Sequence, residues 1–416
     1  MQQPNYMTKI LKNKLSEFIS KIPKSDLHVH LDGSVRVETL IELSKQHKLA
    51  LPSFTVEGLH ELVFKDQYAN LVEYLQGFGY VLPIMQTPEN LEQISYEFAM
   101  DNINEGVCYV EVRFAPQLHI NEHQDIDQVL LSINKGLNRA KTQYNQRPEV
   151  KSKELPEFNY GIIVCAMRFF GTGYSKFYNK FLEIHHHSNL DSIFTMASYE
   201  LAKACVHIRD KYDVPIVALD IAGAEAGNPP IHHKKAYHFA RKNFMYATVH
   251  AGEAYGAESI YQAVTELYAN RIGHGFYLFS EDQISDPKIQ NKNAYIKQLV
   301  QYIANTRTTI EVCLTSNIQT IPTLKSIEDH PFAKMLDNHL STTICTDNRT
   351  VSKTSVTKEI TLAVQHFNLT GKTLENMVVY GFKRSFYPGT YNEKRNYVKQ
   401  IVERYKLLEN QYRGVI

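Results

Sequence analysis

One alternation runs along most of the sequence: a short apolar or β-branched run leads into a stretch with helical periodicity. Eight such runs occur, at Ser25–His30, Cys108–Phe114, Tyr160–Met167, Pro215–Ile221, Phe244–His250, Arg271–His274, Thr308–Val312 and Ser341–Thr346. The sixth run is too short to indicate a strand alone, and only its place in the series supports it. Strands that alternate with helices form parallel βαβ units, and eight such units suggest closure. The sequence therefore predicts an α/β protein with a (β/α)8 (TIM) barrel.

Helical patterns lie between most of these runs, at Val37–His47, Asn70–Val81, Leu91–Glu105, Ile126–Tyr144 and Glu258–Ala269. Two segments exceed what eight minimal units require. We expect additional helices after the first strand, in Gly33–Val107, and a helical insert after the third strand, in residues 168–212. The polar segment Asn145–Phe158 carries two prolines and favours a surface loop over a domain boundary. We expect one barrel domain over residues 1–416, including an N-terminal helix at about 1–23.

The balance of charged residues indicates which kind of molecule the protein binds. The chain has 45 Lys and Arg against 44 Asp and Glu, a formal net charge of +1, and shows no basic stripe. Nucleic-acid binders need such a basic excess because they neutralise phosphates, so we expect a small-molecule partner, with no nucleic acid and no membrane. The N-terminal stretch lacks the apolar region of a signal peptide, and no apolar run has the length of a membrane helix. We therefore expect a cytoplasmic protein, and the sequence leaves its oligomeric state open.

A pair of histidines ends the first predicted strand. His28 and His30 are two residues apart, so both side chains project from the same face of a strand. Two imidazoles at that point can share one divalent metal ion. The alternative is a pair of histidines on a polar strand face, and position favours the metal because barrel active sites lie at the carboxyl ends of the strands.

Three further strand ends carry similar chemistry. His250 and Glu253 follow the fifth run, His274 ends the sixth between two glycines, and Asp347 follows the eighth. In a closed barrel these ends converge over one mouth. Nitrogen ligands with one carboxylate favour zinc, with cobalt or iron as possible substitutes. The five cysteines form no C-x-x-C pair, which argues against a disulfide framework and a thiolate site.

Two other groups of polar residues have simpler explanations. The run of three histidines at 185–187 favours a solvated loop over a metal-binding tract. Glu111 and Arg113 alternate with apolar residues on the second predicted strand. They favour an ion pair inside the barrel over a contact with substrate.

These blocks together resemble the adenosine/AMP deaminase family of zinc hydrolases. The resemblance covers about Lys24 to Phe386 and includes the following motifs: Lys24 to Gly33 (KSDLHVHLDG), Tyr109 to Pro116 (YVEVRFAP), Leu219 to Glu225 (LDIAGAE), His250 to Glu253 (HAGE), Arg271 to Gly275 (RIGHG), Glu311 to Asn317 (EVCLTSN) and Thr346-Asp347. The resemblance implies a metal-dependent hydrolase barrel that uses one zinc ion per chain. Its expected reaction is hydrolytic deamination of adenosine, and of 2'-deoxyadenosine, to the inosine-type product plus ammonia by zinc-bound hydroxide.

The resemblance also implies a role for individual residues. His28, His30, His250 and Asp347 match the family's zinc ligands. Glu253 matches the acid that protonates the purine N1, which requires a raised pKa. His274 matches the residue that orients and deprotonates the attacking water. In the substrate site, Gly223 matches a backbone N–H contact to N3, and Asp32 matches a contact to a ribose hydroxyl.

One position departs from the family pattern. Many members have two consecutive aspartates where this chain has Asp347-Asn348. The second residue is expected to bind N7, an acceptor, so an aspartate there must be protonated to donate. An asparagine amide donates at any pH. We therefore expect Asn348 to bind N7 without a tuned pKa.

Three alternatives to an adenosine deaminase remain at this point. An adenine, AMP or N6-methyl-AMP deaminase would share the chemistry, although the loops after the first and fifth runs lack the basic cluster that a phosphate favours. A binuclear hydrolase typically needs a bridging lysine at the end of the fourth strand, and Leu219–Ala222 contains none. A binding protein on an inactive barrel would not be expected to keep every metal and acid position filled.

Overall fold

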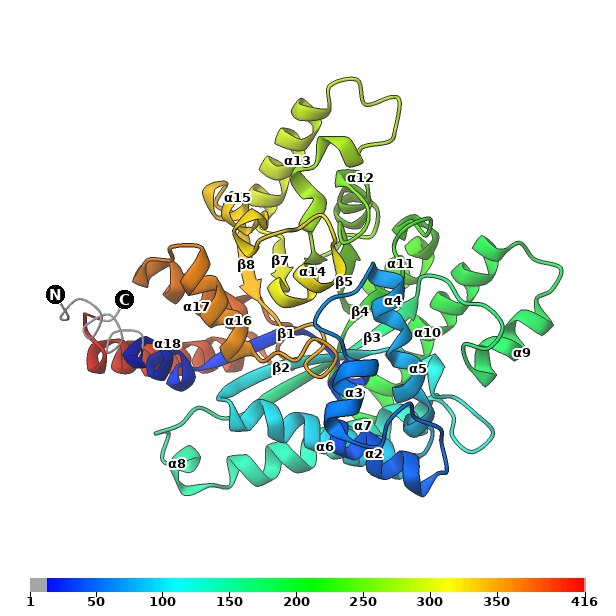
Figure 1. The fold of residues 1–416 in the computed structure, drawn as a ribbon, viewed down its shortest axis with the longest axis horizontal. Helices are drawn as coiled ribbons and strands as arrows, with labels where there is room; N and C mark the ends of the chain where they lie inside the picture. Colours follow the sequence, from blue (N-terminus) through cyan, green and yellow to red (C-terminus); the bar gives the residue numbers. More distant parts are fainter. Residues whose placement is uncertain (1–12, 415–416) are drawn as a thin grey trace.

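Eight parallel strands form the centre of the computed structural model, which describes residues 13–414 (Figure 1). They are β1 (Lys24–His30), β2 (Val107–Phe114), β3 (Asn159–Met167), β4 (Ile216–Ala222), β5 (Tyr246–Ala251), β6 (Arg271–His274), β7 (Thr309–Val312) and β8 (Ser341–Ile344). Each strand pairs with the next along the chain. The barrel closes where His30 N–H donates to Asp347 O at 2.7 Å and Asp347 N–H donates to His28 O at 2.8 Å. The predicted (β/α)8 barrel is confirmed, and each predicted strand ends within two residues of the observed one.

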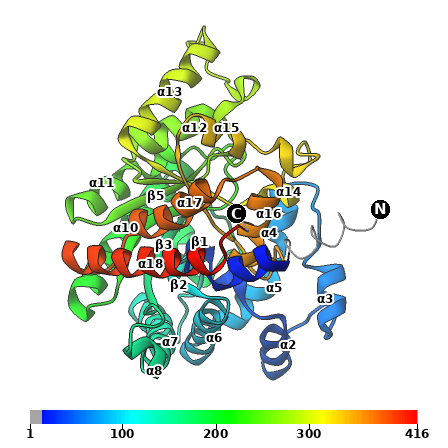
Figure 2. The same ribbon diagram turned by 90° about the vertical axis from the view of Figure 1, so that its left-hand side faces the viewer.

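Helices surround the strands (Figure 2). They are α2 (Val37–Gln46), α3 (Val56–Leu62), α4 (Leu71–Gln76), α5 (Phe78–Val81), α6 (Pro88–Asn104), α7 (Ile126–Asn145), α8 (Pro148–Lys151), α9 (Lys176–Ile184), α10 (Leu190–Tyr212), α11 (Lys234–Lys242), α12 (Ala257–Tyr261), α13 (Lys292–Thr306), α14 (Leu314–Thr320), α15 (Phe332–Asp337), α16 (Val356–His366), α17 (Gly371–Arg384) and α18 (Tyr391–Gln411). Because these helices cover the barrel, the strands are almost entirely buried. No described helix is long and apolar enough to cross a membrane.

The predicted elaborations are present, with differences in detail. The pattern over Asn70–Val81 forms two short helices, α4 and α5, which meet at Gly77. After β3, the additional helix is α9, because α10 is the long helix that returns the chain to β4. The segment Asn145–Phe158 contains the one-turn helix α8. Residues 13–21 are helical, and the first twelve residues of the predicted N-terminal helix lie outside the described range.

Several charged side chains are buried inside the barrel. Glu111 and Arg113 are both fully buried, as expected, but they do not pair with each other. Glu111 pairs with Arg271 of β6, and Arg113 pairs with Asp220 of β4 at 2.8 Å and with Glu311 of β7 at 3.0 Å. The predicted single ion pair was therefore wrong in its partners. Both side chains are buried inside the barrel, where oppositely charged partners on β4, β6 and β7 lie within ion-pair distance.

Candidate active site

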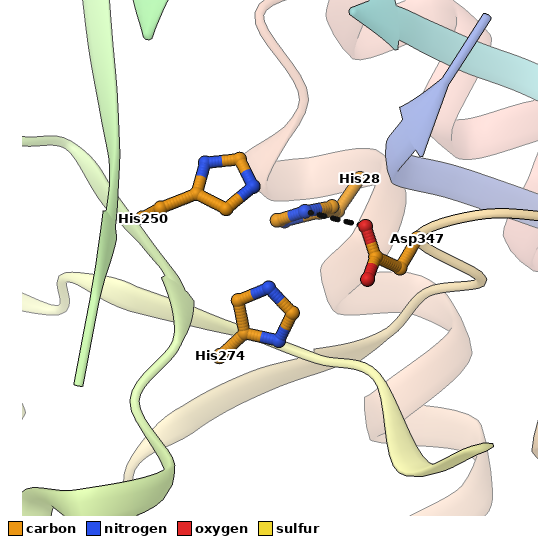
Figure 3. A group of neighbouring side chains, drawn as sticks. All are labelled: His28, His250, His274 and Asp347. Atoms are coloured by element: carbon orange, nitrogen blue, oxygen red, sulfur yellow. Dashed lines mark ion pairs between the residues drawn. The ribbon is translucent and has the colours of Figure 1, made fainter. Parts of the chain in front are cut away.

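A cluster of buried imidazole and carboxylate groups lies at the carboxyl ends of the strands. His28 comes from β1, His250 from β5, His274 from the end of β6, and Asp347 from the turn after β8. One potential ligand atom from each of these residues lies within 4.8 Å of the others. Figure 3 shows the three rings and the carboxylate facing a common centre. This arrangement is a buried His/His/His/Asp metal site.

His30 also reaches this centre. Its Nε2 atom lies 3.2 Å from His250 Nε2 and 3.5 Å from Asp347 Oδ1, and His28 Nε2 lies 3.4 Å from the same oxygen. Ligand atoms on a tetrahedral ion with bonds of about 2.0–2.1 Å lie roughly 3.3 Å apart. The donor spacing therefore fits one metal ion. His28 Nε2 is buried without a hydrogen-bond partner, as expected of an atom reserved for a metal.

Carboxylates behind the rings fix which ring nitrogen faces the centre. His28 Nδ1 lies 2.7 Å from Glu311 Oε2, and His250 Nδ1 lies 3.0 Å from Asp220 Oδ2. An ionised carboxylate only accepts hydrogen bonds, so each Nδ1 carries the proton and each Nε2 presents its lone pair. Although burial alone would raise it, the pKa of Asp347 is held well below its usual value by His28, His274 and His30.

Glu253 stands beside the cluster on the loop after β5. Its carboxyl is 7% exposed, and Oε1 lies 3.6 Å from His274 Nε2. Burial raises the pKa of Glu253 to about 8, and the charges of Asp347 and Glu225 act in the same direction. A carboxyl group with that pKa is protonated at neutral pH and can donate a proton.

Glu225 holds the Glu253 loop in place. Its two oxygens accept from the backbone N–H groups of residues 252, 253, 254 and 255, at 2.7–3.0 Å, and from the Ser259 hydroxyl. Arg168, fully buried after β3, lies 3.9 Å from Glu225 and donates to the carbonyl of His250. The loop that carries Glu253 is therefore fixed by a buried carboxylate.

A cavity of about 340 Å³ opens onto the cluster. His30, His250, His274, Asp347 and Glu253 line its inner end. The remaining wall is largely apolar and comes from α4, α5 and the segments after β3 and β4. Within the described part of the chain, no Lys or Arg lines this cavity.

The three predicted substrate-binding residues also line this cavity. Asp32 Oδ1 is buried without a hydrogen-bond partner, and burial raises the pKa of Asp32 to about 7. Gly223 has φ +102°, a backbone conformation that favours glycine. Asn348 lies directly against Gly33, where an added Cβ would come within 1.7 Å of Asn348 Oδ1.

Several residues that shape the site had no role assigned from sequence. Four of them lie inside motifs that carry the family resemblance, but their partners are distant in the chain: Glu311, Asp220, Glu225 and Asn317. His330 lay outside every motif. The predicted solvated histidine run at 185–187 follows the end of α9, and His186 and His187 are exposed.

Comparison with known proteins agrees with this geometry. The family profile described as adenosine deaminase matches residues 23–404. The chain belongs to the adenosine deaminase family. An adenosine deaminase of Mycobacterium avium (strain 104) is 32% identical over 398 residues, which cover 94% of this chain and 98% of the relative. The protein is therefore a hydrolase of the adenosine deaminase family with a buried metal site.

Solved structures share the fold across a range of substrates. A zinc-bound amidohydrolase from Burkholderia ambifaria has a TM-score of 0.73 at 18% identity, covering 96% of this chain and 94% of that one. The Arabidopsis N6-methyl-AMP deaminase has a TM-score of 0.69 at 22% identity, covering 93% of this chain and 99% of that one. At these identities the likeness supports the barrel fold, and the substrate must be argued from the site.

Proposed function

We propose that this adenosine deaminase family member deaminates adenosine and 2'-deoxyadenosine to the inosine-type products plus ammonia, with one zinc ion per chain. The observation that carries the choice of an unphosphorylated nucleoside is the composition of the cavity wall. A phosphate group needs cationic partners in a low-dielectric site, and none of the described residues that line the cavity is Lys or Arg. This argues against AMP and N6-methyl-AMP as substrates.

The metal ligands in this proposal are His28, His30, His250 and Asp347. Neutral nitrogen donors with one carboxylate suit zinc, and the distances among them support a single ion. When bound, zinc would lower the pKa of a water molecule to about 7 and so supply hydroxide at neutral pH. The lack of lysine at the end of β4 supports one ion over a bridged pair.

Glu253 acts on the purine ring in this proposal. Its protonated carboxyl donates to N1, which draws electron density from C6 and makes that carbon more electrophilic. Hydroxide supplied by the metal would add at C6. The added hydroxyl would then give its proton to the amino group, which would leave as ammonia while C6 becomes the carbonyl of the product. His274, which is 3.6 Å from Glu253, orients the attacking water.

The remaining substrate contacts follow from the cavity wall. The backbone N–H of Gly223 would bind N3, where a side chain would block the base. Asp32 has a buried free oxygen suited to a ribose hydroxyl. The Asn348 amide would donate to N7 at any pH.

A substrate panel tests the proposal. Purified zinc-loaded protein is incubated with adenosine, 2'-deoxyadenosine, adenine, AMP and N6-methyl-AMP, and the loss of purine ultraviolet absorbance is followed. We expect the two nucleosides to give the highest kcat/KM. A higher kcat/KM for either nucleotide, or for adenine, would show that the substrate assignment is wrong. Metal analysis of the same preparation should return one ion per chain.

A further inference from the structure

A chain of buried hydrogen bonds runs away from the metal site behind His274. His274 Nδ1 lies 3.2 Å from Asn317 Nδ2, on α14, and Asn317 Oδ1 lies 3.1 Å from His330 Nε2, just before α15. This chain of hydrogen bonds ends where the backbone N–H of Phe332 donates to His330 Nδ1 at 3.0 Å. His274, Asn317 and His330 are each at most 1% exposed, so no solvent competes for these bonds.

The direction of each bond follows from its outer end. A backbone N–H can only donate, so His330 Nδ1 accepts and carries no proton. Burial lowers the pKa of His330 to about 3, which keeps the ring neutral and leaves its one proton on Nε2. That Nε2–H donates to Asn317 Oδ1. The Asn317 amide nitrogen therefore faces His274 and donates to Nδ1.

These directions decide which nitrogen of His274 carries the proton. Because Nδ1 accepts a hydrogen bond, a neutral His274 ring carries its proton on Nε2, the nitrogen that faces Glu253 and the cluster. His28 has the opposite tautomer, since Glu311 accepts from its Nδ1–H group, and the Asp220 carboxylate, 3.0 Å from His250 Nδ1, favours the same tautomer in His250. A nitrogen that carries a proton cannot coordinate a metal ion.

We propose that Asn317 and His330 are positioning residues that fix His274 as the Nε2–H tautomer and thereby keep it out of the metal's ligand set. The ligands are then His28, His30, His250 and Asp347, although His274 lies in the same cluster of potential ligand atoms. His274 then presents a hydrogen-bond donor toward the reacting atoms, so it orients the attacking water but does not take its proton, in contrast to the deprotonating role that the resemblance implied. This inference rests on the proposed function for the assignment of His274 as the group that orients the attacking water.

The tautomer is measured directly by nitrogen-15 NMR on zinc-loaded protein with labelled histidine, at a pH where the His274 ring is neutral. The His274 resonances are identified by their loss in His274→Gln. We expect a protonated Nε2 and an unprotonated Nδ1. The opposite pattern would overturn the inference. This measurement involves no substrate, so its failure is distinct from failure of the proposed function.

A single substitution should reverse the direction of the hydrogen bond between residue 317 and His274. In Asn317→Asp the new carboxylate accepts from both neighbours, which moves the His274 proton to Nδ1 and turns the Nε2 lone pair toward the metal. With cobalt in place of zinc, the visible absorption spectrum should change as a further nitrogen ligand enters. We expect kcat to fall about 10²-fold with KM changed less than about threefold, as for loss of one oriented group.

Two controls separate this effect from general damage. Asn90→Asp introduces the same change at a buried site on α6, away from the cluster, and should leave the cobalt spectrum and kcat unchanged. His330→Gln keeps an N–H that can donate to Asn317 and should retain most of kcat. A cobalt spectrum of folded Asn317→Asp that matches wild type would overturn the inference. If that variant does not fold, the NMR result on wild type decides.

Discussion

Replacing Glu225 with glutamine tests how strongly the Glu253 loop depends on one buried carboxylate. Oε2 of Glu225 accepts from the N–H groups of Glu253, Ala254 and Tyr255, and Oε1 accepts from Gly252 N–H and from Ser259. Glutamine has nearly the same shape, but one of the two oxygens becomes an NH2 group that can only donate. The substitution therefore removes acceptors without creating a cavity.

The size of the effect follows from the number of bonds. In the least damaging orientation the NH2 replaces Oε1, which leaves Gly252 N–H buried without an acceptor at a cost of about 1–3 kcal/mol. The three bonds to the other oxygen lose charge assistance, and charged acceptors contribute about twice as much as neutral ones. Arg168 also loses a nearby counter-charge. We expect a loss on the order of 3 kcal/mol in the free energy that holds the loop.

The assay compares kcat/KM and urea unfolding for wild type, Glu225→Gln and Glu258→Gln. If the loop energy is expressed in catalysis, 3 kcal/mol corresponds to a fall of about 10²-fold in kcat/KM. Glu258 is the matched control, because it accepts backbone N–H bonds from Ser285 and Asp286 at a solvent-exposed site. Its variant should stay close to wild type. Equal kcat/KM for all three proteins would refute the argument that Glu225 holds Glu253 in position.

Three further results are expected. In Asn348→Asp the new carboxyl donates to N7 only when protonated, so kcat/KM should fall at high pH relative to wild type, and parallel pH profiles would contradict the donor role. Dialysis against a chelator should abolish activity and lower Tm. Added zinc should restore both in wild type but not in Asp347→Ala, and metal-free protein with full activity would exclude a metal mechanism. Burial lowers the pKa of Lys24 from 10.5 to about 8, so between these two pH values the unfolded state binds more protons than the folded state. The free energy of unfolding, measured with urea, should therefore rise by about 3 kcal/mol between pH 8 and 10.5, relative to that of Lys24→Met. If the difference in free energy of unfolding between wild type and Lys24→Met does not vary with pH, the prediction for Lys24 is wrong.

The strands were predictable because each carries its own local pattern. A strand buried on both faces is a nearly continuous apolar run, and most of β3 is such a run. β2 and β4 are also mostly apolar, but they carry the buried charged residues Glu111, Arg113 and Asp220. β6 has only four residues, and its place between two better-defined neighbours identified it. Helix boundaries were less predictable where packing overrides periodicity, as at Gly77, which divides one amphipathic pattern into α4 and α5.

The residues nearest the metal were predictable for a topological reason. Strand ends that are far apart in sequence meet at one mouth, so His28, His250 and Asp347 could be associated without coordinates. Their roles as individual ligands stay predictions. His274, which the sequence also placed at this mouth, lies in the same cluster, and distance alone does not separate a ligand from a neighbour.

The supporting residues could not be predicted in the same way. Glu311 meets His28 across 283 positions, and Glu225 meets the Glu253 loop across 28. Each contact depends on a side-chain direction inside the barrel that no local period encodes. His330 illustrates the limit, because its importance appears only through the direction of two consecutive hydrogen bonds.

Two residues of the site adopt backbone conformations that the barrel must impose. His274 has φ +64° and Asp347 has φ +62°, in the left-handed region that non-glycine residues occupy at a cost of about 1–3 kcal/mol. His274 is the last residue of β6, and Asp347 lies three residues after the end of β8, where hydrogen bonds to β1 hold it through both its N–H and its carbonyl. That pairing closes the barrel, so the interaction that completes the fold also turns the Asp347 carboxylate toward His28. Closure of the barrel and assembly of the metal site are therefore one structural event in this chain.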